Sequence, residues 1–160
     1  MILLGLGANL PSAIGPPVAT LESVLGALVA EDVIILRRSS WYRSAPVPAG
    51  DQPWYVNGVV AVATRLDPPA LLALLHRVEA RMGRVRRERN EPRVVDLDIL
   101  DYDGAVRAEG PVLPHPRMHE RGFVLLPLRE VAPDWRHPVS GAALPALIAA
   151  LPPDQTTERM

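Results

Sequence analysis

The spacing of hydrophobic positions along the chain changes between a period of two and the helical spacing of three and four. Runs of apolar and β-branched residues predict strands over residues 2–8, 33–42, 54–65 and 94–101. Apolar residues at helical spacing predict a helix over 17–30 and a second helix from Pro68 to Gly83. The first hundred residues therefore predict four strands and two helices in the order β-α-β-β-α-β.

This order is typical of the ferredoxin-like arrangement, an antiparallel sheet with helices packed on it. Further loops are expected over 43–53, 84–93 and 111–118, a hairpin turn at Asp103-Gly104, and two more helices near 119–126 and 142–151. We therefore expect an α+β fold with three layers, α/β/α with additions. No repeat or linker divides the sequence, so one domain over residues 1–160 is expected.

The composition excludes several classes of protein. A formal net charge of −1 provides no global field for a polyanion, so nucleic acid is not an expected partner. The absence of cysteine excludes disulfides and thiolate chemistry. We find neither a basic leader nor an apolar run near the ~20 residues that cross a membrane, so we expect a cytoplasmic protein. All 17 basic residues are arginine, which excludes the lysine-dependent P-loop and protein-kinase mechanisms.

Asp96 and Asp98 form the most informative pair. Apolar residues alternate with them, so both carboxylates lie on one face of a strand, roughly 6.5–7 Å apart along the chain. Aspartate is disfavoured in strands, and a divalent cation would turn the repulsion of the two charges into attraction. Oxygen ligands that leave room for water and phosphate oxygens suit magnesium. The alternative is a solvated strand face.

The segment before this strand is rich in arginine. Between residues 77 and 93 the chain carries Arg77, Arg81, Arg84, Arg86, Arg87, Arg89 and Arg93. By itself such a run favours an exposed basic loop, neutralised by the glutamates around it. Beside the two aspartates it favours a metal–polyphosphate site, because guanidinium groups bind phosphate oxygens bidentately.

Other candidate residues have a structural and a functional interpretation. Gly5-Leu6-Gly7 lacks the third glycine of a dinucleotide fingerprint and is interpreted as the end of a strand. His76 fits a helix surface better than a ligand position. His115 lies between two prolines in a rigid loop, and considered alone it fits a structural role better than a functional one. Phe123, the only phenylalanine, fits core packing when considered alone.

A series of short motifs follows the predicted elements in order. They are Gly7-Ala8-Asn9-Leu10, Tyr42-Arg43-Ser44, Asp51-Gln52-Pro53-Trp54-Tyr55-Val56-Asn57, Gly83-Arg84-Val85-Arg86, Pro92-Arg93-Val94-Val95-Asp96-Leu97-Asp98-Ile99, Pro114-His115 and Arg121-Gly122-Phe123. Together these motifs resemble the 6-hydroxymethyl-7,8-dihydropterin pyrophosphokinase family of folate biosynthesis, over residues 2 to 135. The resemblance implies transfer of pyrophosphate from ATP to the pterin hydroxymethyl group, with release of AMP.

The resemblance also implies roles for individual residues. Asp96 and Asp98 would hold two magnesium ions that bridge the ATP phosphates, and Arg84 and Arg93 would act on the transferring group. The implied ATP-binding residues are His76, Glu79, Arg84, Arg86, Arg87, Arg93, Ile99, His115 and Arg121, with Arg89 assisting. The implied pterin-binding residues are Ser44, Ala45, Val47, Tyr55, Asn57 and Phe123. An aromatic sandwich and an amide that donates and accepts are what a flat heteroaromatic ring requires.

The sequence departs from the family pattern in the arginine loop, where Asn90-Glu91 replaces a common aromatic-glycine pair and the loop is one residue shorter. His76 replaces a common glutamine, Gly110-Pro111-Val112 stands where a basic or hydroxyl residue is frequent, and Pro116 replaces a larger residue.

Two rival hypotheses are an RNA-binding module of the same fold and a binding domain without turnover. Only 4% of residues are aromatic, which disfavours the RNA module. Nothing demands more than a monomer.

Overall fold

The computed structural model describes residues 1–46, 53–83 and 94–160. Within these residues the elements are β1 (Ile2–Ala8), α1 (Pro17–Ala30), β2 (Ile34–Arg38), β3 (Tyr42–Ser44), β4 (Tyr55–Ala63), α2 (Pro68–Arg81), β5 (Asp96–Tyr102), the 3₁₀ turn η1 (Met118–Glu120), α3 (Gly122–Val131), α4 (Leu144–Ala149) and β6 (Thr157–Arg159).

The strands form one six-stranded sheet in the order β5-β1-β4-β3-β6, and β2 pairs with β4 next to β3. All these pairs are antiparallel. β2 and β3 together occupy the place of one strand, so the first four strand positions follow the ferredoxin-like order. The predicted α+β fold with an antiparallel sheet is confirmed.

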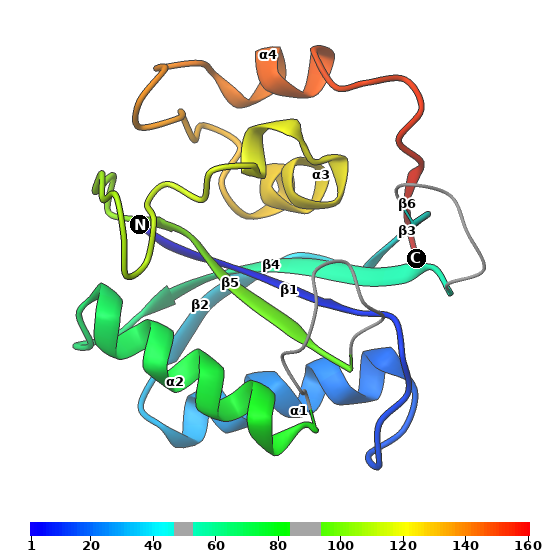
Figure 1. Ribbon diagram of the computed structural model, residues 1–160. Coiled ribbons are helices and arrows are strands. Elements are labelled where there is room, and N and C mark those ends of the chain that lie inside the picture. Colours follow the sequence, from blue (N-terminus) through cyan, green and yellow to red (C-terminus); the bar gives the residue numbers. More distant parts are fainter. Residues whose placement is uncertain (47–52, 84–93) are drawn as a thin grey trace.

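Helices cover both faces of the sheet, which gives the predicted α/β/α layers (Figure 1). α1 and α2 lie against one face, where Leu4, Leu6 and Ala8 of β1 join their core. α3 and α4 lie against the other, where Leu3 of β1 joins a second core. This division follows from the period of two in a strand, which sends successive side chains to opposite faces.

The start and end of α2 follow from its local sequence. The Asp67 side chain accepts a hydrogen bond from the backbone N–H of Ala70 at 2.9 Å, and Pro68 and Pro69 occupy the first turn, where no N–H is required. After the helix, Gly83 adopts a φ of 92°, a left-handed conformation that glycine tolerates best.

Some element boundaries differ from the predicted ones. The strand expected over 33–42 is divided at Ser39, whose hydroxyl accepts from the Val59 N–H at 3.0 Å. The helix expected near 119–126 becomes η1 followed by α3, because Arg121 has an extended backbone with φ −113° and ψ 112°. The last helix is shorter than expected, and β6 was not predicted. The turn at Asp103-Gly104 is present, with positive φ at both residues, but the expected hairpin is wrong, because among the described strands β5 pairs with β1 alone.

Candidate active site

A cavity of about 560 Å³ opens on the α3 side of the sheet. α3 and α4 pack over the end of that face formed by Leu3, Val59 and Leu100 and leave the opposite end uncovered. At the uncovered end, the sheet presents small and polar residues instead of large apolar ones. The cavity floor is formed by Gly5, Gly7, Asn57, Asp96 and Asp98.

The two aspartates lie opposite glycines in the sheet. Asp96 pairs with Gly7, and Asp98 pairs with Gly5, across the antiparallel β1–β5 ladder. Neither carboxylate therefore has a β1 side chain directly across from it in the ladder, and both line the cavity. The described residues contain no group of three or more acidic, histidine or cysteine side chains that could hold a metal ion. Two carboxylates suit a cation such as magnesium, which keeps water or phosphate oxygens as its other ligands.

His115 stands beside the carboxylates at the end of a rigid loop. Its Nε2 lies 4.0 Å from an Asp98 carboxylate oxygen, and its backbone N–H donates to the Leu100 carbonyl at 2.9 Å. Burial, assisted by the charge of Arg121, lowers the pKa of His115 to about 4. The ring is thus neutral at pH 7, and its contact with Asp98 is not a charge pair. Because Nδ1 accepts from the Arg117 N–H at 3.2 Å, the ring proton is assigned to Nε2, facing Asp98.

A fixed amide forms the next part of the floor. Asn57 is buried, with 4% of its surface exposed, and its Nδ2 donates to the Ser44 hydroxyl at 2.8 Å. Its Oδ1 lies against Gly7, where an added Cβ would approach to 2.8 Å. The amide orientation is therefore set from two sides, by a hydroxyl on β3 and by the lack of a side chain on β1.

Aromatic and cationic side chains line the walls. Tyr55 of β4 and Phe123 of α3 both border the cavity, and Phe123 also packs on the edge of the α3–α4 core. The Arg121 guanidinium carbon lies 5.3 Å from the Phe123 ring centroid, within the range of a cation–π interaction. The cavity therefore combines apolar ring faces, an oriented amide, a guanidinium and two carboxylates.

The structure brings many of the predicted site residues together around this cavity. They are Ser44, Ala45, Tyr55, Asn57, Asp96, Asp98, His115, Arg121 and Phe123. Val47, Arg84, Arg86, Arg87, Arg89 and Arg93, like Asn90 and Glu91, lie outside the described residues.

Three predicted nucleotide-binding residues lie elsewhere. His76 is exposed on α2, and Ile99 is buried in the core on the opposite face of the sheet. Glu79 is 1% exposed, and its carboxylate accepts from the Leu97 N–H of β5 at 2.9 Å. Their predicted contacts with ATP remain predictions.

The cavity also has a lining that sequence reasoning missed. Arg117, His119 and Glu120 contribute from the loop before α3, and the C-terminal part contributes Leu147, Ala150, Pro152, Gln155, Thr156 and Thr157. The first group lies between the motifs Pro114-His115 and Arg121-Gly122-Phe123, which could have indicated it. The second group carries no motif and no periodic pattern.

Comparisons with known proteins agree on one family. Residues 3–133 match the family model described as 7,8-dihydro-6-hydroxymethylpterin-pyrophosphokinase (HPPK). A Methylorubrum extorquens protein named 2-amino-4-hydroxy-6-hydroxymethyldihydropteridine pyrophosphokinase is 46% identical over 133 residues, which cover 82% of each chain. A Synechocystis protein of the same name is 42% identical over 149 residues, covering 91% of this chain and 73% of its own.

The fold is similar to a crystal structure of Plasmodium falciparum HPPK-DHPS with pterin and p-hydroxybenzoate, at a TM-score of 0.71 and 14% sequence identity. That match covers 92% of this chain but 43% of the longer one, so the chain spans less than half of that protein. In the described part of the chain, no helix combines the length and apolarity needed to cross a bilayer.

Proposed function

The chain belongs to the 7,8-dihydro-6-hydroxymethylpterin-pyrophosphokinase family, and we propose that the cavity over β1, β4 and β5 is its active site. The enzyme transfers pyrophosphate from ATP to the hydroxymethyl group of 6-hydroxymethyl-7,8-dihydropterin and releases AMP, a step in folate synthesis. The proposal concerns which residues perform this transfer and where each substrate lies.

The pterin ring is placed between Tyr55 and Phe123. Both aromatic side chains border the cavity, and the buried amide of Asn57 lies on its floor. Because Ser44 fixes the Asn57 amide, its remaining hydrogen-bonding capacity has a defined direction, which suits the polar edge of a heteroaromatic ring. Ser44, Ala45 and Val47 complete the proposed pterin contacts.

The ATP phosphates are placed over Asp96 and Asp98. These carboxylates fit two magnesium ions, because the donors are oxygens only and glycine stands opposite each of them. When bound, magnesium would neutralise the charge of the pyrophosphoryl group and of the departing AMP. His115 and Arg121 lie in the same cavity, and Arg84 and Arg93, with Arg86 and Arg87, are assigned to the phosphates from the sequence.

The chemistry demands positioning more than covalent participation. The pterin hydroxyl oxygen forms a bond to the β-phosphorus and loses its proton to solvent, while the bond between that phosphorus and the α–β bridging oxygen breaks as AMP leaves. The floor would hold the pterin hydroxymethyl group and the phosphates at one place, and guanidinium groups would stabilise the charge that develops. A neutral His115 can donate from Nε2 without adding charge.

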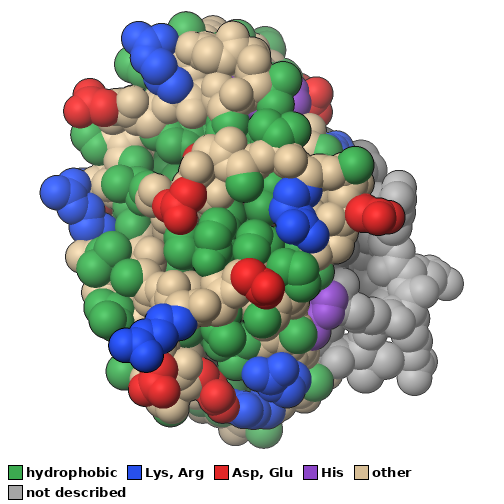
Figure 2. All heavy atoms as spheres, turned by 90° about the vertical axis from the view of Figure 1, so that its left-hand side faces the viewer, with side chains coloured by type: hydrophobic (Ala, Val, Ile, Leu, Met, Phe, Trp, Pro, Cys, Tyr) green, Lys and Arg blue, Asp and Glu red, His purple; other side chains and the backbone are tan. Residues whose placement is uncertain are grey.

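We further propose that residues 1–160 act as one catalytic domain, monomeric and cytoplasmic, with no nucleic-acid partner. On the face shown in Figure 2, arginine and acidic side chains are interspersed among hydrophobic ones, and neither sign gathers into a patch. The formal net charge of −1 likewise provides no global field for a polyanion.

One observation supports the proposal most strongly: a carboxylate pair, an oriented amide and two aromatic walls share a single cavity. The test is AMP release from ATP with and without the pterin, followed by calorimetry on Phe123→Ala and Tyr55→Ala. Both variants should weaken pterin binding more than ATP binding, since ring stacking contributes about 0.5–1.5 kcal/mol beyond area burial. Equal losses for the two ligands would assign the rings to general packing.

A further inference from the structure

The C-terminal segment closes one side of the cavity, although it lies beyond residues 3–133 that match the family. After α4 the chain returns towards the sheet, where β6 joins the edge of β3 (Figure 1). Gln155, Thr156 and Thr157 line the cavity on this return path. We call residues 155–157 the C-terminal strap.

The strap is joined to the β3 wall of the cavity through backbone hydrogen bonds. Thr157 pairs with Ser44, the residue whose hydroxyl fixes the Asn57 amide. The Ala45 N–H donates to the Thr156 carbonyl at 3.1 Å, which continues the contact beyond the end of β3. One end of the strap is therefore held to the side of the cavity that orients the amide.

At its other end, the strap contacts the turn that carries Arg121 through the side chain of Gln155. The Gln155 Nε2 donates to the Glu120 carbonyl at 2.7 Å, and its Oε1 accepts from the Gly122 N–H at 2.7 Å. Gly122 has the first N–H of α3, which has no partner within the helix. The same amide thus bridges the backbone on both sides of Arg121.

The packing at this bridge leaves little room for movement. A Cβ added at Gly122 would lie 3.2 Å from the Gln155 Oε1 and 3.3 Å from the Thr157 hydroxyl. The turn and the strap are therefore in close contact through backbone and short side chains, and Phe123 follows directly.

We propose that Gln155 is a positioning residue for the pterin pocket, because it fixes the turn of residues 120–123 against the β3 wall. This inference rests on the proposed placement of the pterin between Tyr55 and Phe123. Phe123 and the Ser44–Asn57 pair lie on opposite sides of the pterin site. The Gln155 amide holds the Phe123 side through Glu120 and Gly122, and the backbone of the next two residues of the strap holds the β3 side, so Gln155 sets the separation of the two. A carboxamide provides a donor and an acceptor side by side, which these two backbone groups require.

The test compares Gln155→Ala and Gln155→Glu with wild type in steady-state kinetics. Gln155→Glu preserves the shape and can still accept from Gly122, but it loses the donor and places a carboxylate against the Glu120 carbonyl. Both variants should raise the pterin KM about 5- to 10-fold, with a smaller change in the ATP KM and in kcat. Asp154→Ala, an exposed change in the adjacent position outside the cavity lining, is the control and should leave the constants at wild-type values.

Phe123→Ala measured in the same series separates this inference from the proposed function. A raised pterin KM in Phe123→Ala, together with unchanged constants in both Gln155 variants, would overturn the role of Gln155 alone. An unchanged pterin KM in Phe123→Ala would overturn the pterin placement itself. A lower melting temperature for Gln155→Ala without any change in pterin KM would reduce Gln155 to a structural residue and also overturns the inference.

Discussion

Two glycines decide the chemistry of the cavity floor as much as the charged residues do. Gly5 and Gly7 share one face of β1 and stand opposite Asp98 and Asp96. A Cβ added at Gly5 would contact the Leu100 side chain at 3.3 Å, and one added at Gly7 would approach the Asn57 Oδ1 to 2.8 Å. Gly7 has a second neighbour in β4, since Asn57 lies opposite it and turns its Oδ1 towards the glycine backbone. The missing side chain at Gly7 thus bears on both the proposed phosphate end and the proposed pterin end of the site.

Gly7→Ala should therefore act through Asn57. The new Cβ would stand 2.8 Å from the Asn57 Oδ1, so the amide must move and its bond to Ser44 is strained or lost. Disturbing a buried polar group costs about 1–3 kcal/mol, which corresponds to a rise in pterin KM of roughly 5- to 150-fold. The check is a double-mutant cycle with Asn57→Ala. Gly7→Ala should add little to the pterin KM once the amide is gone, and a full additional loss would contradict this coupling.

Asp96→Ala and Asp98→Ala should each lower turnover by about 100-fold or more, in line with the loss of one well-placed electrostatic group. The metal-free fold should remain intact, because removing one carboxylate also removes repulsion between like charges on one strand face. Turnover measured across a magnesium titration, with melting curves in EDTA, tests both statements. Near-normal turnover of both variants at low magnesium would contradict the assignment of these residues to the metal.

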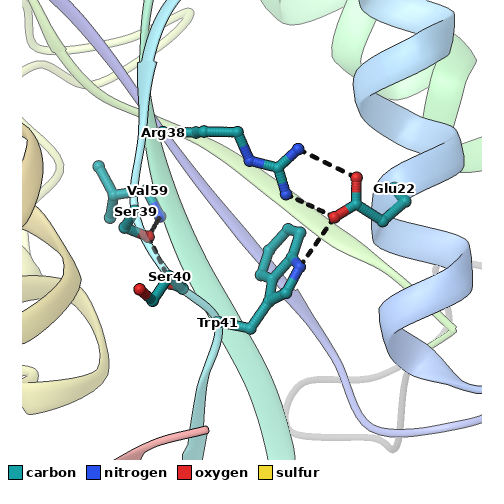
Figure 3. Close-up of polar contacts among 6 residues, drawn as sticks. All are labelled: Glu22, Arg38, Ser39, Ser40, Trp41 and Val59. Carbon is teal, nitrogen blue, oxygen red and sulfur yellow. Dashed lines mark hydrogen bonds and ion pairs between the residues drawn. The ribbon is translucent and has the colours of Figure 1, made fainter.

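At the scale of elements, α1 is tied to the edge of the sheet by one carboxylate. Glu22 of α1 accepts two hydrogen bonds from Arg38, at 3.0 and 2.5 Å, and one from the Trp41 Nε1 at 3.0 Å (Figure 3). The Arg38 guanidinium carbon also lies 5.4 Å from the Trp41 ring centroid. The ring packs against Gly58, where a Cβ would approach it to 2.6 Å. This cluster braces the helix against β2 and β4 on the face opposite the cavity.

Glu22→Gln should lower stability modestly and leave the site unaffected. The hydrogen bond from Arg38 lowers the pKa of Glu22 below its ordinary value of 4.5. The stabilisation is therefore present above pH 4.5 and is lost as the pH falls through the lower folded-state pKa. Because both side chains are partly exposed, the expected loss at pH 7 is about 0.2–1 kcal/mol. Urea unfolding at pH 7 and pH 3 checks it, and a difference from wild type that stays constant across this range would contradict the ionic contribution.

The elements with a strong hydrophobic period were predictable, and those made by tertiary contacts were not. α1 and α2 each bury one face at helical spacing, and the central strands β1 and β4 bury side chains on both faces, so the apolar residues of these elements mark them in the sequence. β6 is three residues long with no such face, and its pairing with β3 depends on backbone groups that any sequence provides. The split between β2 and β3 arises at Ser39, whose hydroxyl bonds the Val59 N–H.

The same distinction holds for the site. Asp96 and Asp98 could be predicted to face one surface, because a charged pair on one face of a strand is unusual. Phe123 considered alone indicated core packing, and only the motif Arg121-Gly122-Phe123 of the family indicated that it borders a site. Gln155 could not, since its role comes from contacts with residues 120 and 122 that are distant in sequence.

For the whole molecule, the two faces of the sheet differ in how completely they are covered. α1 and α2 bury one face along its length, while α3 and α4 leave the end with Asp96 and Asp98 open. The stability of the fold and the chemistry of the site are thereby divided between two layers. Groups at their boundary, such as His115, contribute to both.

His115 should make the metal-free enzyme sensitive to acid. Burial lowers its pKa from 6.5 to about 4, so between these values the unfolded chain binds a proton that the native state does not. Stability therefore falls as the pH decreases from 6.5 to 4, by an amount on the order of 3 kcal/mol for a shift of this size. Burial also lowers the pKa of His137, which adds a contribution of the same sign.

Urea unfolding in EDTA at several pH values between 7.5 and 4 measures the slope of the unfolding free energy against pH. His115→Gln should flatten it, and His76→Gln, which removes an exposed histidine of α2, is the matched control. An equal slope in His115→Gln and wild type would show that the acid sensitivity arises from other groups.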